Sequence, residues 1–216
     1  MDLINLALIA TSPMVMNEVV NVQVVATSAT VEQNMTSTDL VFQWDPSVLQ
    51  LIGIDNTNNL EALISFLPQG NWDFYGINES MPPADGNGLY FWLAPLTGIP
   101  VYVPTSGALL TTLQFRVLQP VPTTVEILPS YTVFYTADTV IYGSSVPGTN
   151  VTGKTTNAQL SCALGDFNCD GGVGSADMAM MLTSWNDTSF TENPYDLNNN
   201  GVVDAGDLSI LLDNWG

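Results

Sequence analysis

The chain has 216 residues, of which 21 are acidic and only Arg116 and Lys154 are basic, so its formal net charge is −19. A surface this acidic repels nucleic acid and anionic lipid and attracts cations. The sequence contains no histidine, which excludes Ser-His and Cys-His catalytic pairs. Because 46% of the residues are hydrophobic and only 11% are charged, the composition is that of a folded chain and not of a disordered acidic tail.

Two features concern the location of the protein. No segment has the roughly 18 consecutive apolar residues that a membrane-spanning helix needs. Residues 1–12 lack the basic start of a signal peptide, so we expect the chain to begin at or near a mature terminus.

The first 161 residues predict a β-sandwich. Apolar residues alternate with polar ones in residues 18–27 and 38–44, which is typical of half-buried strands. Further strands are predicted at residues 48–54, 88–94, 108–118, 123–128, 131–137 and 157–161, between clusters of Pro, Gly and Asn. Only residues 62–67 favour a helical turn. Eight or nine strands without a long helix indicate a mainly β domain over residues 1–161.

The pattern changes after residue 161, where an internal repeat begins. Two twelve-residue segments, DFNCDGGVGSAD (166–177) and DLNNNGVVDAGD (196–207), start 30 positions apart. Each is followed by apolar residues at helical spacing, in MAMMLTSWN (178–186) and LSILLDNWG (208–216). We therefore predict a second domain, residues 162–216, of two loop-helix units with Met181, Leu182, Leu208 and Leu211 in its core.

The two loops match the calcium loop of an EF-hand, in which oxygen ligands come from positions 1, 3, 5, 7 and 12 and glycine occupies position 6. The expected glycines are Gly171 and Gly201. The predicted ligands of the first loop are Asp166, Asn168, Asp170, the carbonyl oxygen of Gly172, and Asp177. Those of the second loop are Asp196, Asn198, Asn200, the carbonyl oxygen of Val202, Asp204 at position 9, and Asp207. We expect two Ca²⁺ ions, because ordinary turn formation does not account for two complete matches in tandem.

Other candidate sites carry open alternatives. Cys162 and Cys169, seven positions apart, either form a disulfide, which is compatible with export, or remain free thiols. Sequons begin at Asn34, Asn78, Asn150 and Asn186, and in a chain rich in Asn and Thr they are either glycosylation sites or chance matches.

The segments DGGVGSADMAMML and NGVVDAGDLSILL resemble the repeats of dockerins, small calcium modules that begin directly with the loop. The resemblance covers residues 164–216 and implies that Ser175, Ala176, Met178, Ala205 and Gly206 help to contact a cohesin partner. Dockerins of cellulosomes usually carry basic residues in the following helix, and this chain has none, which puts partner selection through salt bridges in doubt.

The first domain resembles cohesins in VFQWDPSVLQLIGIDN (41–56) and GALLTTLQFRVL (107–118). This similarity implies a nine-stranded jelly-roll sandwich that binds dockerins. A different jelly roll, such as a carbohydrate-binding module, is the alternative.

Catalytic groups are scarce. Asp73 and Glu79 form the one pair of carboxylates worth considering for glycoside hydrolysis, and we predict that the protein is not an enzyme. Trp72, Tyr75, Tyr90 and Trp92 either form a platform for sugars or, as their spacing along strands favours, lie in the core or an interface.

Together these features predict an extracellular, non-catalytic assembly protein. Residues 162–165 span about 14 Å at most, too short for the second domain to fold back onto the middle of its own sandwich face. Docking is therefore expected between copies, head to tail, as a ring or filament homopolymer. The alternatives are an adaptor for other cohesin- or dockerin-bearing proteins, or a carbohydrate-binding module anchored by its dockerin.

Overall fold

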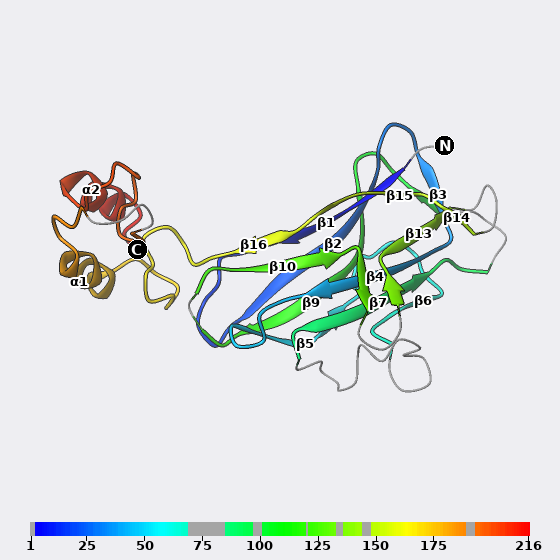
Figure 1. Ribbon diagram of the computed structural model, residues 1–216, viewed down its shortest axis with the longest axis horizontal. Helices are drawn as coiled ribbons and strands as arrows, with labels where there is room; N and C mark the ends of the chain where they lie inside the picture. The colour runs from blue at the N-terminus through cyan, green and yellow to red at the C-terminus, as the bar shows by residue number, and fades with distance from the viewer. Residues whose placement is uncertain are drawn as a thin grey trace.

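The structure is a computed structural model that describes residues 3–68, 85–96, 101–119, 121–132, 136–143, 148–188 and 193–216. An elongated sandwich of strands carries two helices beyond one of its ends (Figure 1). Five residues considered above lie outside the described ranges: Trp72, Asp73, Tyr75, Asn78 and Glu79.

The first sheet has the order β15-β1-β2-β9-β5. Its strands are β1 (Ile4–Ala10), β2 (Val19–Ser28), β5 (Leu49–Asp55), β9 (Ala108–Val117) and β15 (Thr152–Thr156). Neighbouring strands are antiparallel except for β1 and β15, which are parallel. The sandwich thus brings the beginning of the chain beside the last strands before the helices.

The second sheet is built around β4 (Ser37–Gln43). Strand β7 (Asn87–Leu93) pairs along one edge of β4, whereas β10 (Thr123–Leu128) and β13 (Val140–Gly143) share the other edge. The sheet also contains β6 (Ile64–Phe66), β14 (Thr149–Asn150) and β16 (Ala158–Leu160). Two small pairs join β3 (Gln33–Met35) to β8 (Val101–Val103) and β11 (Ser130–Thr132) to β12 (Thr136–Asp138).

Two local predictions are wrong. Residues 62–67 form no helical turn, because Ile64–Phe66 is strand β6 and pairs with β7. The single strand predicted at residues 131–137 is replaced by two paired strands, β11 and β12, in which Tyr131 lies opposite Ala137. In both segments pairing with a neighbouring strand determined a structure that a short apolar run left ambiguous.

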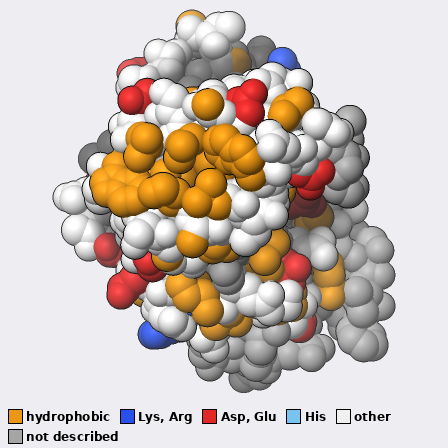
Figure 2. Space-filling view, turned by 90° about the vertical axis from the view of Figure 1, so that its left-hand side faces the viewer, with side chains coloured by type: hydrophobic (Ala, Val, Ile, Leu, Met, Phe, Trp, Pro, Cys, Tyr) orange, Lys and Arg blue, Asp and Glu red, His pale blue; other side chains and the backbone are white. Residues whose placement is uncertain are grey.

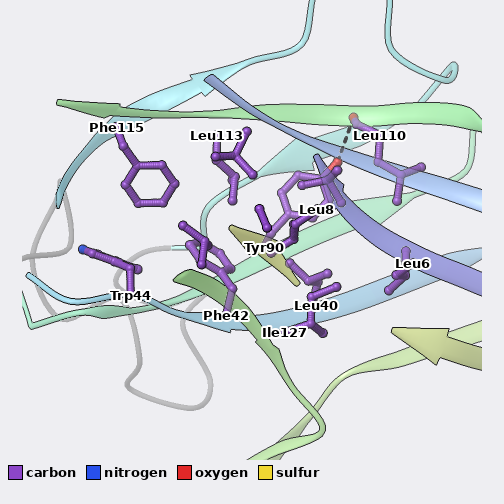
Figure 3. Close-up of a cluster of buried hydrophobic side chains, with 14 of the residues drawn as sticks. Leu6, Leu8, Leu40, Phe42, Trp44, Tyr90, Leu110, Leu113, Phe115 and Ile127 are labelled. Atoms are coloured by element: carbon purple, nitrogen blue, oxygen red, sulfur yellow. Dashed lines mark hydrogen bonds between the residues drawn. The ribbon is translucent and has the colours of Figure 1, made fainter. Parts of the chain in front are cut away.

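The core lies between the two sheets (Figure 3). The rings of Trp44 and Phe115 meet edge to face with centroids 5.4 Å apart. Tyr90 is fully buried, its hydroxyl donates to the Leu110 carbonyl oxygen at 3.0 Å, and burial raises its pKa. Trp92 is equally buried. Tyr90 and Trp92 are therefore core residues, and neither can stack on a sugar.

The two outer faces of the sandwich differ in chemistry. On the first sheet, Asn21 lies opposite Gln114 and Gln23 opposite Thr112, and the exposed Arg116 follows on the same face of β9. On the second sheet, the half-buried rings of Phe66 and Phe91 meet edge to face at 6.0 Å. On this second face the acidic side chain of Asp39 lies opposite Phe91.

The second domain contains the two predicted helices, α1 (Ser175–Thr183) and α2 (Ala205–Asp213). Both begin three residues earlier than predicted, since the last three positions of each loop already form the first helical turn. In the described part of the chain, neither helix is long and apolar enough to cross a membrane.

Candidate calcium-binding module and docking surface

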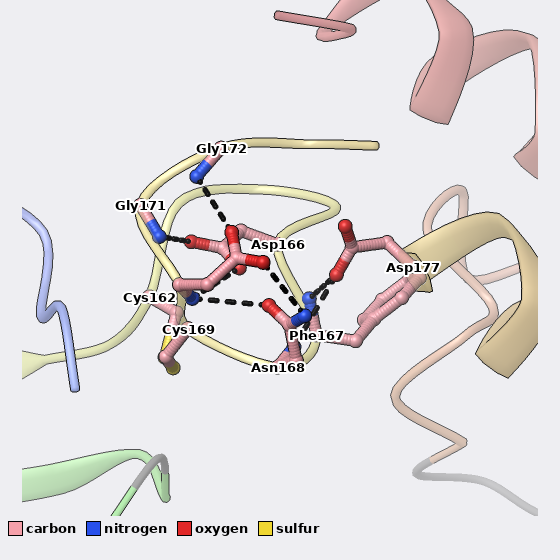
Figure 4. Close-up of a disulfide and its surroundings, with 9 residues drawn as sticks. Cys162, Asp166, Phe167, Asn168, Cys169, Gly171, Gly172 and Asp177 are labelled. Atoms are coloured by element: carbon pink, nitrogen blue, oxygen red, sulfur yellow. Dashed lines mark hydrogen bonds between the residues drawn. A yellow bond between two sulfur atoms is a disulfide. The ribbon is translucent and has the colours of Figure 1, made fainter. Parts of the chain in front are cut away.

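The first loop, residues 166–177, is organised by its own carboxylates (Figure 4). The two side-chain oxygens of Asp166 accept hydrogen bonds from the backbone N–H groups of Asp170 (3.1 Å) and Gly171 (3.0 Å). Gly171 has φ +98°, a left-handed conformation that glycine adopts without strain. Asp170 in turn accepts from the Gly172 N–H at 3.2 Å. The chain therefore wraps around the side chains at positions 1 and 5.

The second loop, residues 196–207, repeats this geometry. Asp196 accepts from the backbone N–H groups of Asn200 (3.1 Å) and Gly201 (2.8 Å), and Gly201 has φ +90°. Asn200 accepts from the Val202 N–H at 2.9 Å. The amide oxygens at position 3, of Asn168 and Asn198, accept from the N–H of position 5 at 3.0 and 2.9 Å. Two different sequences thus give one loop conformation.

The aspartate at position 12 of each loop also caps the helix that follows. Asp177 accepts from the Gly174 N–H, and Asp207 from the Asp204 N–H, both at 2.8 Å. The other oxygen of each carboxylate reaches back to its own loop, to the N–H of Phe167 at 2.8 Å and of Asn198 at 3.1 Å. This double role explains why the helices start inside the loops.

At position 9 the two loops differ, because the second has Asp204 where the first has Gly174, which lacks a side chain. Its carboxylate accepts from the Gly206 N–H at 2.7 Å and so caps α2. The same contact gives this side chain a structural role in addition to the predicted ligand role.

The chemistry of both loops suits a hard cation. Asp166, Asp177, Asp196 and Asp207 are 3%, 1%, 9% and 0% exposed, although each is an acid. Burying a carboxylate costs free energy unless a cation or several hydrogen bonds compensate. Both basic residues of the chain lie on strands of the sandwich, Arg116 in β9 and Lys154 in β15, and not in the loops. The side chains at positions 1, 3, 5 and 12 offer carboxylate and amide oxygens, which Ca²⁺ prefers as ligands.

The carboxylates of one loop do not converge by themselves. Within the described ranges, no three Asp, Glu, Cys or His side chains gather into a metal-binding cluster. Each loop instead holds its carboxylates on backbone N–H groups and supplies amide and carbonyl oxygens as well. The fit to calcium therefore depends on this mixed oxygen set.

Cys162 and Cys169 form a disulfide with their Cα atoms 5.4 Å apart. Among the sequons, Asn150 and Asn186 are exposed, whereas Asn34 is half-buried in β3. Asn150 uses its side-chain oxygen to accept from the Thr152 N–H at 2.9 Å. Glycosylation remains a prediction at all four sequons.

The two repeats share a small core. Val173, Met181, Val203 and Leu211 are buried together, with Leu208 packed at the edge. Leu182, which was predicted to join them, is 49% exposed, so that prediction is wrong. The reason is the phase of α1, which turns Met181 inward and the next residue outward.

Residues of two kinds lie on the surface of the module. Ser175, Ala176, Ala205 and Gly206 are exposed as predicted, whereas Met178 packs against the small core. Four large apolar side chains also lie on the surface, where no pattern in the sequence had placed them. Leu182 and Trp185 are 49% and 37% exposed, and their counterparts in the second repeat, Leu212 and Trp215, are 51% and 44% exposed. We call these four residues the Leu-Trp surface. The repeated Trp near the end of each unit was the available signal.

Figure 2 views the end of the molecule that carries the helices and shows a broad hydrophobic surface there. An exposed apolar area of this kind marks a site of protein interaction. Among the described residues of this module, the exposed large hydrophobic side chains are the four of the Leu-Trp surface and Leu164.

Comparisons with known proteins agree with this architecture. Residues 164–214 match the family model of the dockerin type I domain, and such domains bind calcium. A comparison with curated proteins gave no match.

Solved structures resemble the sandwich. CaCohA2 from Clostridium acetobutylicum aligns with a TM-score of 0.52 and 12% identity, covering 74% of this chain and 90% of that one. The cohesin module of a Clostridium perfringens family 33 glycoside hydrolase aligns at 0.51 and 8%, covering 75% and 98%. A type III cohesin module from a cell-surface anchoring scaffoldin of Ruminococcus flavefaciens aligns at 0.50 and 10%, covering 74% and 88%.

These structural alignments show the fold of the sandwich. The match to the dockerin type I family model concerns the module that follows it. Cohesins and dockerins are non-catalytic modules that bind each other. The chain therefore consists of a cohesin-like β-sandwich joined to a dockerin type I module.

Proposed function

We propose that this protein is a non-catalytic, extracellular assembly protein whose copies associate head to tail, the dockerin module of one chain docking on the sandwich of the next. The observation that carries the proposal is the placement of the two modules. The N–H of Met16 in the sandwich donates to the Cys169 carbonyl oxygen at 2.8 Å and so holds the module at the end of the sandwich. The helices lie beyond that end (Figure 1), and docking has to occur between chains.

The proposed docking requires two Ca²⁺ ions. We assign them to the first loop, through Asp166, Asn168, Asp170, the Gly172 carbonyl and Asp177, and to the second loop, through Asp196, Asn198, Asn200, the Val202 carbonyl and Asp207. Asp204 is an additional ligand candidate. The ions supply positive charge that no side chain of the module provides. The side chains themselves hold the loop backbone and cap the helices, which orients the Leu-Trp surface.

Apolar side chains make most of the contact that we propose. Two copies that each carry a charge of −19 repel one another, and two calcium ions per chain compensate only four of those charges. The Leu-Trp surface contains no charged residue, and its proposed receptor is the face that carries the rings of Phe66 and Phe91, on which Asp39 lies opposite Phe91. Small residues at Ser175, Ala176, Ala205 and Gly206 allow close approach beside it.

The test is electron microscopy and sedimentation of the full chain, first with calcium and then with chelator. Filaments or rings that dissolve in chelator are expected. A monomer at every calcium concentration would contradict assembly and favour the adaptor function, in which other cohesin- or dockerin-bearing proteins are the partners.

A chain-terminating variant tests the head-to-tail order. The double variant Leu182→Asp, Leu212→Asp keeps its sandwich but has a charged Leu-Trp surface, so small amounts added to the wild type should shorten the assemblies. Thr183→Asp is the matched control, because its counterpart in the second repeat is the exposed Asp213. Equal shortening by both variants would argue against this surface.

A further inference from the structure

The sandwich contacts the two calcium loops unequally. Residues 14–18, between β1 and β2, lie beside the first loop, and the Met16 N–H donates to the carbonyl oxygen of Cys169 in that loop at 2.8 Å. The Met14 N–H donates to the carbonyl oxygen of Ser161, which precedes the loop, also at 2.8 Å. The side chain of Val15 lies over the turn at Gly171, 3.4 Å from where a Cβ atom would be. A Cβ atom at the equivalent Gly201 would meet nothing within 4 Å.

The disulfide adds a second inequality. Cys169 occupies position 4 of the first loop with φ +53°, and Asn199 occupies position 4 of the second with φ +54°. This left-handed conformation is unfavourable for most residues but tolerated by asparagine. The second loop has the tolerant residue, whereas the first holds a fully buried cysteine in the same conformation and ties it to Cys162. The closed ring contains Asp166 and Asn168.

Constraints of this kind act on the metal-free state. A metal-free loop loses conformational freedom when it closes around an ion, and a cross-link removes part of that freedom beforehand. Both loops carry three aspartates, so their formal charges are equal. The differences that remain are the disulfide, the contact with the sandwich, and the residues at position 5 (Asp170 or Asn200) and position 9 (Gly174 or Asp204).

We propose that the first loop is a preorganised calcium site that also fixes the dockerin module on the sandwich, and that the second loop is the weaker, exchangeable site. The inference rests on the proposed function, which assigns one ion to each loop. Coupling between sites is reciprocal, so calcium in the first loop strengthens the contact with residues 14–18 and the contact raises calcium affinity. Calcium concentrations that empty only the second loop would then alter docking while the two modules keep their relative orientation.

A calcium titration of the ¹⁵N-labelled full chain, followed by NMR, separates the two loops without any mutation. The N–H groups of Gly171 and Gly201 each donate to the first aspartate of their own loop, at 3.0 and 2.8 Å, and so report on each site. In the oxidised wild type, Gly171 should reach saturation at a lower calcium concentration than Gly201.

The double variant Cys162→Ser, Cys169→Asn gives the first loop the residue of the second at position 4. Its first site should bind calcium about 10- to 100-fold more weakly, and its second site should change little. Asp170 is retained, so the effect of its charge is excluded. Simultaneous saturation of Gly171 and Gly201 in the oxidised wild type, or an unchanged first site in the double variant, overturns the inference. No calcium response at either glycine would instead overturn the proposed function.

Hydrogen exchange tests the contact with the sandwich. The Met16 N–H is bonded across the junction, whereas the adjacent Asn17 N–H donates within the sandwich, to the Val117 carbonyl oxygen at 3.0 Å. Chelator should accelerate exchange at Met16 at least about tenfold and leave Asn17 protected. Equal protection of Met16 with and without calcium, or equal loss at both residues, contradicts the coupling.

Discussion

The backbone N–H of Asn186 donates a 2.8 Å hydrogen bond to the carbonyl oxygen of Val203, so the end of the first repeat is attached to the second loop. Its counterpart is the 3.1 Å bond from the Gly216 N–H to Val173 in the first loop. The end of each repeat is thus hydrogen-bonded to the calcium loop of the other, and the shared core contains residues of both repeats. Each repeat therefore owes part of its stability to contacts with the other.

Calcium removal is expected to unfold residues 164–216 and leave the sandwich folded. A module of this size buries little apolar surface, so bound metal contributes a large share of its folding free energy. Limited proteolysis with mass spectrometry should find cleavage confined to the dockerin module in chelator. A module that resists protease without metal would show that its small core is sufficient.

Asp166→Ala should abolish calcium binding at the first loop. Its carboxylate holds the N–H groups of Asp170 and Gly171, so the backbone turn is lost together with the ligand. Calorimetric titration should show at most one ion bound per chain. The control Asp213→Ala removes an equal charge from an exposed position of α2 and should leave the stoichiometry unchanged. Two ions bound by Asp166→Ala would refute the assignment.

Neighbouring leucines in α2 should separate folding from docking. Leu211 is fully buried, and its replacement by alanine should destabilise the module by about 2–5 kcal/mol. Leu212 is 51% exposed, so Leu212→Ala should keep the calcium-loaded fold and weaken association between chains. Circular dichroism and sedimentation measure the two effects. The interpretation fails if Leu212→Ala unfolds the module or if it associates normally.

Added salt should strengthen association between chains at saturating calcium. The two partners are both strongly acidic, and about 0.1 M salt screens charges beyond about 10 Å. Added salt does not weaken the apolar contacts made by the Leu-Trp surface. Sedimentation across a sodium chloride series checks this, and dissociation by salt would indicate that ion pairs dominate the interface.

Asp39 on β4 should make the sandwich less stable as the pH rises. Burial raises the pKa of its carboxyl from 3.8 to about 6, so the fold favours the neutral form. Its stabilising contribution is complete below about pH 3.8 and is lost as the pH rises through about 6. Asp138 and Tyr142 line the same pocket. The melting temperature of Asp39→Asn minus that of the wild type should increase between about pH 4 and pH 7; a constant difference would contradict this.

Much of the candidate site could be read from the sequence because its residues are close together along the chain. Side chains at positions 1, 3, 5 and 12 bind the backbone of their own loop, so the spacing in the sequence is also the spacing in space. The strands were predictable for a related reason. Alternation in residues such as Val20, Val22 and Val24 follows directly from the geometry of a half-buried strand.

The starts of the helices and the exposure of Leu182 depended on details that periodicity does not resolve. The position-12 aspartates cap the helices from inside the loops, which moves each helix three residues toward the N-terminus. Which of two adjacent apolar residues, Met181 or Leu182, enters the core depends on the side that α1 turns toward the second repeat.

By itself, the sequence determined two loops with the ligand chemistry of calcium and a sandwich with alternating strands, since both follow from short-range backbone geometry. Only the tertiary structure decided that Val15 and Met16 lie against the first loop and not the second. That contact joins segments near opposite ends of the chain, and it forms because β1 pairs with both β2 and β15. Closure of the sandwich thus adds a long-range contact to the disulfide and the differences in ligand residues that already make the two loops inequivalent.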